Sequence, residues 1–182
     1  MKYYQLSSAF GKIGKELELP EYLKEICSHI ASGNISREKV DEILINHHIH
    51  YSIAKVEFLK LIFEYIKRAL EDNILTCQEK EDIKFLKGWF RIRQGDFYYH
   101  NKEDIEQVIT YHLSKIYQDN FVTDEEALLK VDLQEIFDLS FDQMNNYSKI
   151  QAHCCPEFAT QDFLIVYKSV VTDLQEQYFY LK

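Results

Sequence analysis

A short motif that occurs twice constrains the fold of this chain more than any other feature. The first copy begins at Asp72 and reads DNILTCQE, and the second begins at Asp119, 47 residues later, and reads DNFVTDEE. Each copy lies between two stretches whose apolar residues recur with helical spacing. Supersecondary units that recur at a set interval are typical of helical repeat architectures. The sequence therefore predicts two helix-turn-helix units built on one plan.

The first unit is predicted from residues 54–70 and from the helix that follows the first motif. Apolar side chains in 54–70 fall on one face of a helix. Thr76 and Glu79 have the T-x-x-E spacing of a capping box, in which the hydroxyl and the carboxylate each accept a backbone N–H at the start of a helix. The second helix is predicted to end before a turn at residues 94–96.

The second unit repeats this pattern. Asn101 is placed to cap its first helix, and His112 on the apolar stripe of that helix is interpreted as a core histidine with its hydrogen bonds satisfied. Thr123 and Glu126 form the second capping box. Core positions also match between the units at the 47-residue offset, Leu86 with Leu133 and Phe90 with Phe137. The repeat therefore extends past the turn into the second helix.

Residues 1–53 are predicted to form an N-terminal helical flank. Two short helices are expected over 8–19 and 20–31, separated by Pro20, and Ser36 is expected to cap a third helix. The stretch 33–36 resembles the repeated turn but is one residue shorter and lacks its acid, so it is not counted as a third copy.

The fold class predicted from these patterns is all-α, a helical bundle around a two-repeat core at 54–147. A further short helix is expected after Ser140. The polar stretch 143–160 is interpreted as a linker, and 161–180 is compatible with either a helix or a strand. Residues 148–182 are predicted to form a C-terminal extension that packs on the core.

Composition and charge exclude several classes of partner. The chain has 182 residues, 46% of them hydrophobic, and a formal net charge of −9. That sign is wrong for binding a nucleic acid backbone or an anionic membrane, so a basic protein is the expected partner. No apolar run reaches the length of a membrane helix, no secretory signal is expected at the start, and the four cysteines show no C-x-x-C spacing. We therefore expect a cytoplasmic protein with free thiols, and the sequence leaves the oligomeric state open.

The repeated turns and the helices around them, over about residues 54–147, resemble the tellurite-resistance TerB-like family. Asp72-Asn73 and Asp119-Asn120 stand where that family has Asp-Gly, and asparagine is the non-glycine residue that best tolerates the left-handed conformation. The resemblance implies a helical fold and binding of a divalent metal. Its implied ligands in this sequence are Asp72, Glu79, Asp119 and Glu126.

Helix capping explains the same acidic residues without a metal, and capping is the interpretation that we favour. Metal sites at His47-His48-Ile49-His50 and at His153-Cys154-Cys155 are weaker alternatives. No carboxylate or cysteine set nearby completes the first, and three soft ligands adjacent in sequence, as in the second, rarely converge on one ion. No cofactor is expected. Catalytic templates such as a nucleophile elbow or a P-loop are missing, and Glu25 with His29 one helical turn later is a common chance pair, so the sequence predicts a protein that is not an enzyme.

The strongest surface signal is a run of acidic residues between 118 and 147, a stretch in which Lys130 is the single lysine or arginine. Those with helical spacing beside the apolar face predict an acidic ridge for docking a basic protein. Tyr98 and Tyr99, between the units, are candidate aromatic anchors. The acids of the predicted docking surface are Asp119, Asp124, Glu125, Asp132, Glu135, Asp138 and Asp142.

The leading functional hypothesis is an acidic cytoplasmic binding protein that resembles bacterial toxin immunity proteins. Such a protein would neutralise a basic nuclease toxin by covering its active-site cleft. Two alternatives stay open, a TerB-like stress-response protein that binds a divalent metal and a phage-type inhibitor that mimics the charge of DNA.

Overall fold

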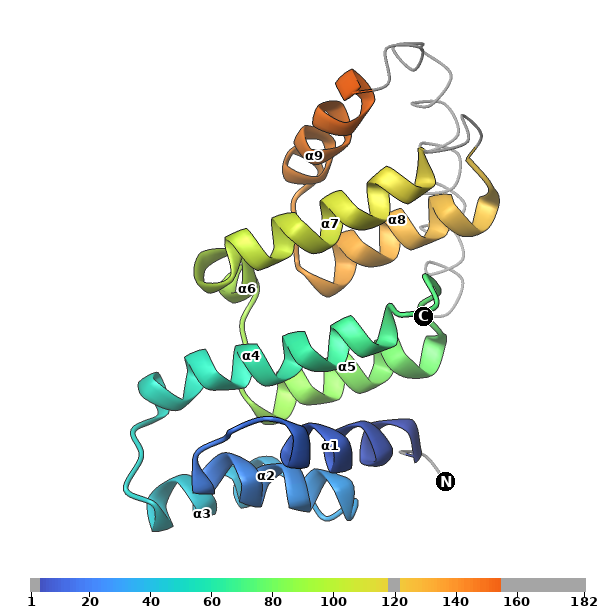
Figure 1. Cartoon of the computed structure of the whole chain (residues 1–182). Helices are drawn as coiled ribbons and strands as arrows, with labels where there is room; N and C mark the ends of the chain where they lie inside the picture. The colour runs from blue at the N-terminus through green and yellow to red at the C-terminus, as the bar shows by residue number, and fades with distance from the viewer. Residues whose placement is uncertain (1–3, 118–121, 155–182) are drawn as a thin grey trace, which may run out of the picture.

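The computed structural model describes residues 4–117 and 122–154, and all regular structure in that part of the chain is α-helical (Figure 1). The predicted all-α class is confirmed. The described helices are α1 (Tyr4–Glu16), α2 (Glu21–Ala31), α3 (Arg37–Asn46), α4 (Tyr51–Ala69), α5 (Cys77–Trp89), α6 (Asp96–His100), α7 (Lys102–Ile116), α8 (Asp124–Ile136) and α9 (Phe141–Cys154).

The two predicted helix-turn-helix units are α4–α5 and α7–α8, and they repeat with the predicted spacing. The first helices of the pairs end at Ala69 and at Ile116, which are 47 residues apart. The second helices, Cys77–Trp89 and Asp124–Ile136, start and stop at the same offset. Only the N-terminal ends differ, because the short helix α6 precedes α7 where α4 is continuous.

Both predicted capping boxes are formed. Thr76 Oγ1 accepts the N–H of Glu79 at 3.2 Å, and Glu79 Oε2 accepts the N–H of Thr76 at 2.9 Å. In the second unit the corresponding distances between Thr123 and Glu126 are 3.2 Å and 2.8 Å. Each box satisfies two backbone N–H groups that the start of a helix otherwise leaves unpaired.

A third helix pair, α2–α3, belongs to the same plan although its turn was not counted from the sequence. After α3, α5 and α8 the chain enters the left-handed region, with φ of 55°, 50° and 54°. An apolar residue follows each time, and its N–H donates to a carbonyl five residues earlier, closing the helix end. The left-handed residues are His48, Arg91 and Asp138. None of them is glycine, the residue that usually marks such a helix end in a sequence, so these ends could not be predicted from glycine positions.

The helix pairs are stacked in layers, with α4–α5 between the layer of α1, α2 and α3 and the layer of α6, α7 and α8 (Figure 1). Aromatic rings pack both within and between the layers. Phe58 of α4 stacks on Phe90 at 4.3 Å between ring centroids, and Phe137 lies 5.9 Å from Phe63 and 6.1 Å from Phe97. Phe90 and Phe137 are the matched positions of the repeat, and both are fully buried.

Several details differ from the sequence predictions. Asn101 precedes α7 but makes no side-chain cap bond. Its amide nitrogen donates to Asp104 at 3.4 Å, and its oxygen, the atom that would accept a backbone N–H in a cap, has no partner among the described residues. The helix after Ser140 is confirmed with its cap, but it runs to Cys154, so the interpretation of 143–154 as a linker is wrong. The segment 161–180 lies outside the described residues.

The predicted domain boundaries also do not coincide with connections between helices. Residue 53 lies inside α4 and residue 147 inside α9. Among the described residues, no helix is both long and apolar enough to cross a membrane.

Removing the cap hydroxyl should destabilise both repeats similarly. Thr76→Ala and Thr123→Ala should each lower the free energy of unfolding by about 1 kcal/mol, and the double variant by about the sum, because the turns share no partner. Urea denaturation followed by circular dichroism measures this. Thr110→Ala, at an exposed position within α7, is the control and should cost almost nothing. An equal loss of unfolding free energy in the three single variants, including Thr110→Ala, would contradict the capping role.

Candidate functional site

The acids of the repeated turns are occupied by local hydrogen bonds. Asp72 Oδ1 accepts the N–H of Ile74 at 3.0 Å, and the carboxylates of Glu79 and Glu126 belong to the capping boxes. Asp119 lies outside the described residues. Within the part of the chain that the structure describes, no three His, Cys, Asp or Glu side chains gather as a metal site would require. The described members of the ligand set implied by the TerB-like resemblance therefore have local hydrogen-bonding roles and do not form a shared site.

The predicted acidic ridge on α8 faces α5, and its acids form ion pairs within the molecule. Three lysines of α5 contact these acids, with distances between lysine Nζ and carboxylate oxygen of 2.8, 2.9 and 2.8 Å. The lysines recur at helical spacing along α5, and they face Asp132 and Glu135 of α8 and Asp138 just beyond its end, so the pairs form rungs along one seam. The rungs of this interhelix ladder are Lys80–Asp132, Lys84–Glu135 and Lys87–Asp138.

Asp132 corrects the prediction of an exposed ridge most clearly. The residue is only 3% exposed, and Lys80 is its ion-pair partner. Burial raises the pKa of Asp132 above its ordinary value, whereas the hydrogen bond and the positive charge of Lys80 act in the opposite direction. A carboxylate in this position is a structural contact between the two repeats and is not accessible to a partner.

Other acids remain on the surface without a described ion pair, and four of them lie at the turns of the two repeats. Figure 1 shows the starts of α5 and α8 at the same end of the stacked helices. Lys115, near the end of α7, links the second repeat to the turn of the first, because its Nζ donates to Asn73 Oδ1 at 3.3 Å. We call Glu71, Asp72, Asp124 and Glu125 the turn-end acids; all four are exposed.

The predicted aromatic anchors lie at the opposite end of α7. Tyr98 and Tyr99 belong to α6, and α7 is 15 residues long, which corresponds to about 22 Å. Tyr99 is 83% exposed, whereas Tyr98 is half-buried and packs against the core. Asp142, exposed in the first turn of α9, is also separated from the turn-end acids by the length of α8. The structure thus does not assemble all predicted partner-binding residues into one surface.

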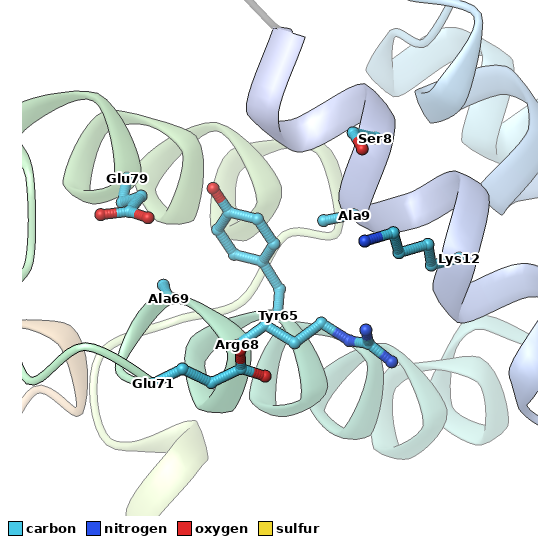
Figure 2. A pocket seen from close by; sticks show the side chains of 8 residues that line it. All are labelled: Ser8, Ala9, Lys12, Tyr65, Arg68, Ala69, Glu71 and Glu79. Carbon is cyan, nitrogen blue, oxygen red and sulfur yellow. The ribbon is translucent and has the colours of Figure 1, made fainter.

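A small cavity of about 250 Å³ lies between α1 and the C-terminal half of α4 (Figure 2). Lys12 and Arg68 contribute its positive charge, and Glu71 and Glu79 contribute its negative charge. Arg68 is paired with Glu16 at 2.5 Å. The cavity thus contains both signs of charge in a small volume.

The phenol of Tyr65 borders this cavity and connects it to a buried acid that sequence reasoning missed. Tyr65 donates to Asp82 Oδ2 at 2.9 Å, and Gln78 donates to Asp82 Oδ1 at 2.9 Å. Burial and the carboxylate of Asp82 raise the pKa of Tyr65 far above its ordinary value, so the phenol stays protonated and acts as a donor. This arrangement anchors α5 to α4 beneath the cavity.

The structure joins two histidines that the sequence placed in separate patterns. Glu25 of α2 contacts His47 at the end of α3 at 2.9 Å and His29 at 3.9 Å. All three side chains are partly exposed, with side-chain accessibilities of 39%, 30% and 29%. The interaction joins the two helices of the α2–α3 pair. His48 and His50 do not join it, because His48 is exposed in the connection and His50 caps α4.

The buried imidazole of His112 has a ring nitrogen without a hydrogen-bond partner among the described residues, contrary to the prediction of a core histidine with its hydrogen bonds satisfied. The residue is 4% exposed, and among the described residues Nδ1 has no hydrogen-bond partner. Desolvation, assisted by the nearby charge of Lys115, lowers the pKa of His112 below its ordinary value of 6.5.

Comparisons with known proteins add no family to this description. No family model matches the chain, and searches of curated proteins and of solved structures return no match.

Removing one partner of the buried rung should be costly. Lys80→Met should lower the free energy of unfolding by about 3 kcal/mol, because Asp132 would stay buried without its cation. Lys84→Met, at the exposed rung, is the matched control and should cost less than about 1 kcal/mol. The double variant Lys80→Met/Asp132→Leu should recover most of the loss. Urea denaturation measures all three, and equal effects of Lys80→Met and Lys84→Met would contradict the assignment.

His112 should make stability depend on pH. Its folded-state pKa lies below the unfolded value, so as the pH falls below about 6.5 the unfolded chain binds a proton that the folded chain does not. The stability contribution is complete above that pH and is lost below it. His112→Phe should flatten this part of the curve of unfolding free energy against pH, whereas His100→Gln, at an exposed position, should leave it unchanged. Parallel curves for wild type and His112→Phe would rule out this role.

Proposed function

We propose that this chain is a non-enzymatic, acidic, cytoplasmic binding protein that acts as an immunity or antitoxin protein. Its partner would be a basic toxin, a nuclease in the favoured case, whose active-site cleft it covers. The observation that carries the proposal is the group of turn-end acids, four exposed carboxylates without a described ion pair at one end of the stacked repeats.

The charge that remains after internal pairing supports this choice of surface. The interhelix ladder neutralises two acids of α8 and Asp138 just beyond its end, whereas Asp124 and Glu125 in the first turn of the same helix have no described ion-pair partner. With a net charge of −9, the chain presents a negative field to an approaching protein. Complementary charge speeds the encounter with a basic surface and disfavours acidic competitors.

The construction of the repeat turns supports binding by a surface that is already formed. The capping boxes fix the starts of α5 and α8, and the Lys115–Asn73 contact joins one turn to the neighbouring repeat. Acids on a prepared scaffold lose little conformational freedom on binding, so more of the interaction energy appears as affinity. Covering a cleft requires only such a surface and no chemistry from the inhibitor.

The proposal is tested by identifying the partner and then neutralising the turn-end acids. A tagged chain would be captured from its native host at moderate salt, and the complex analysed by intact-mass spectrometry. Expected is one stoichiometric basic protein. If the captured protein is a nuclease, adding the purified chain should inhibit its cleavage of nucleic acid.

The charge variant then defines the docking surface. Glu71→Gln/Asp72→Asn/Asp124→Asn/Glu125→Gln should weaken partner binding about tenfold and reduce its salt dependence, since each exposed pair contributes a few tenths of a kcal/mol. The control neutralises four exposed acids away from the turns, Glu21, Glu38, Glu42 and Glu103, for the same change in net charge. Equal weakening by both variants, or no weakening by either, would remove the turn-end acids from the mechanism.

The alternatives retained from the sequence are separated by different outcomes. Bound metal on the purified protein, or a rise in melting temperature on addition of calcium or another divalent ion, would favour the TerB-like interpretation. A partner that is a host DNA-binding protein would favour a phage-type mimic of DNA charge.

A further inference from the structure

A cavity of about 400 Å³ lies where the α1–α2 connection, α4 and the start of α7 meet. It is larger than the cavity of Figure 2 and has a different chemical character. Apolar side chains of Leu17, Leu19, Leu61 and Phe63 line one part of it. Carboxylates and an amide line the rest, together with two lysines.

We propose that this cavity receives an arginine side chain from the basic partner, with the guanidinium held by the carboxylates and the aliphatic stem against the leucines. The identity of the donor as a partner protein rests on the proposed function. The preference of the cavity for a guanidinium rests on the charge of its lining, on the ring of Phe63 and on the unused acceptor of Asn101.

Charge favours a cation in this cavity. Four carboxylates line it against two lysines, a balance of −2. Both lysines already have partners on α4, Lys60 with Glu57 at 3.1 Å and Lys67 with Glu64. The other two carboxylates, Glu18 and Asp104, have no ion pair among the described residues, so a new cation would find them available.

Asn101 supplies an independent observation. Its side chain borders the cavity and the residue is only 8% exposed. Its amide nitrogen donates to Asp104, but its oxygen accepts no hydrogen bond from the described residues although it is buried. An unused buried acceptor is unfavourable, and a ligand with several donors can relieve it. A guanidinium has five N–H donors and no acceptor.

Phe63 distinguishes an arginine from other cations. Its ring already attracts a cation in this molecule, since Lys67 Nζ lies 5.6 Å from the ring centroid. A guanidinium is planar and weakly hydrated, so it stacks on an aromatic face and binds a carboxylate through two N–H groups at once. An ammonium does neither equally well.

The cavity is also connected to the proposed docking surface by the sequence of α4. Glu57 and Glu64 lie seven residues apart, two helical turns along one stripe. Glu71, one of the turn-end acids, follows after another seven residues, just beyond the end of the helix. A basic protein bound at the turn end can therefore extend along this stripe to the cavity.

The test uses the full chain labelled with ¹⁵N and three small probes, N-acetyl-arginine amide, its lysine counterpart and its neutral isostere N-acetyl-citrulline amide. The arginine probe should bind with a Kd on the order of 1–10 mM, as expected for so small a ligand. Its shifts should be confined to backbone signals around residues 17–19, 57–67 and 101–104. The lysine probe should bind more weakly and the citrulline probe not at all.

Matched variants decide whether the site is specific. Asp104→Asn should weaken the arginine probe at least about threefold, whereas Glu103→Gln, the same charge change one residue away and outside the cavity lining, should not. No shifts, equal shifts with citrulline, or equal weakening by the two variants would overturn the proposal. A preserved melting temperature confirms that each variant is folded.

A titration of the captured partner separates this inference from the proposed function. Glu18→Gln/Asp104→Asn should weaken partner binding while the turn-end acids are intact. If a stoichiometric basic partner binds this variant as tightly as wild type, the cavity does not receive its arginine and the inference fails, although the proposed function stands. If the arginine probe binds the cavity but no basic partner is captured, the proposed function fails and the guanidinium preference stands.

Discussion

Burial of α4 from several sides is the constraint on which the rest of the structure depends. This 19-residue helix buries nine of its side chains, and they are spread over more than one face. A helix of that kind cannot be stable in water by itself, so other helices must cover it. Helix α1 packs against α4 from the layer of α1, α2 and α3. Helix α5 packs against it within its own layer, and α6 packs against it from the layer of α6, α7 and α8. Covering α4 in this way stacks the helix pairs. The rings of Phe58 and Phe90 stack within the α4–α5 layer, and the rings of Phe63 and Phe137 pack between two layers.

Stacking determines where charge remains free. When α5 and α8 face each other across the layers, lysines on one helix meet acids on the other, and the ladder forms. One rung is buried at Asp132, where losing a partner is costly, and another is exposed at Glu135, where it matters little. Asp124 and Glu125, which have no described ion pair, lie in the first turn of α8, away from the rungs of the ladder. The same contact that joins the repeats thus shifts the available negative charge from the middle of α8 to one end of the molecule.

Sequence reasoning located the repeat units well but did not reveal which acids are paired, for one physical reason. Capping by Thr76 and Thr123 is local, because donor and acceptor lie three residues apart, and it could be predicted. The acidic spacing on α8 was also visible, but its partners lie about 50 residues away, so the sequence showed the charges without showing their neutralisation. Lys80, Lys84 and Lys87 have the helical spacing that would have suggested the ladder. The cavity beside Asn101 had no signal at all, since three separate segments form it.

The sequence by itself determined the all-α class, the two capped turns, the 47-residue offset and the acidic balance. These properties depend on neighbouring residues or on composition, which a linear pattern records. Only the tertiary structure decided which acids are paired, that Asn101 does not cap its helix, that the tyrosines and the turn-end acids lie at opposite ends, and where a cavity remains. Those properties depend on which faces of different helices meet, and that follows from burying all the apolar faces at once.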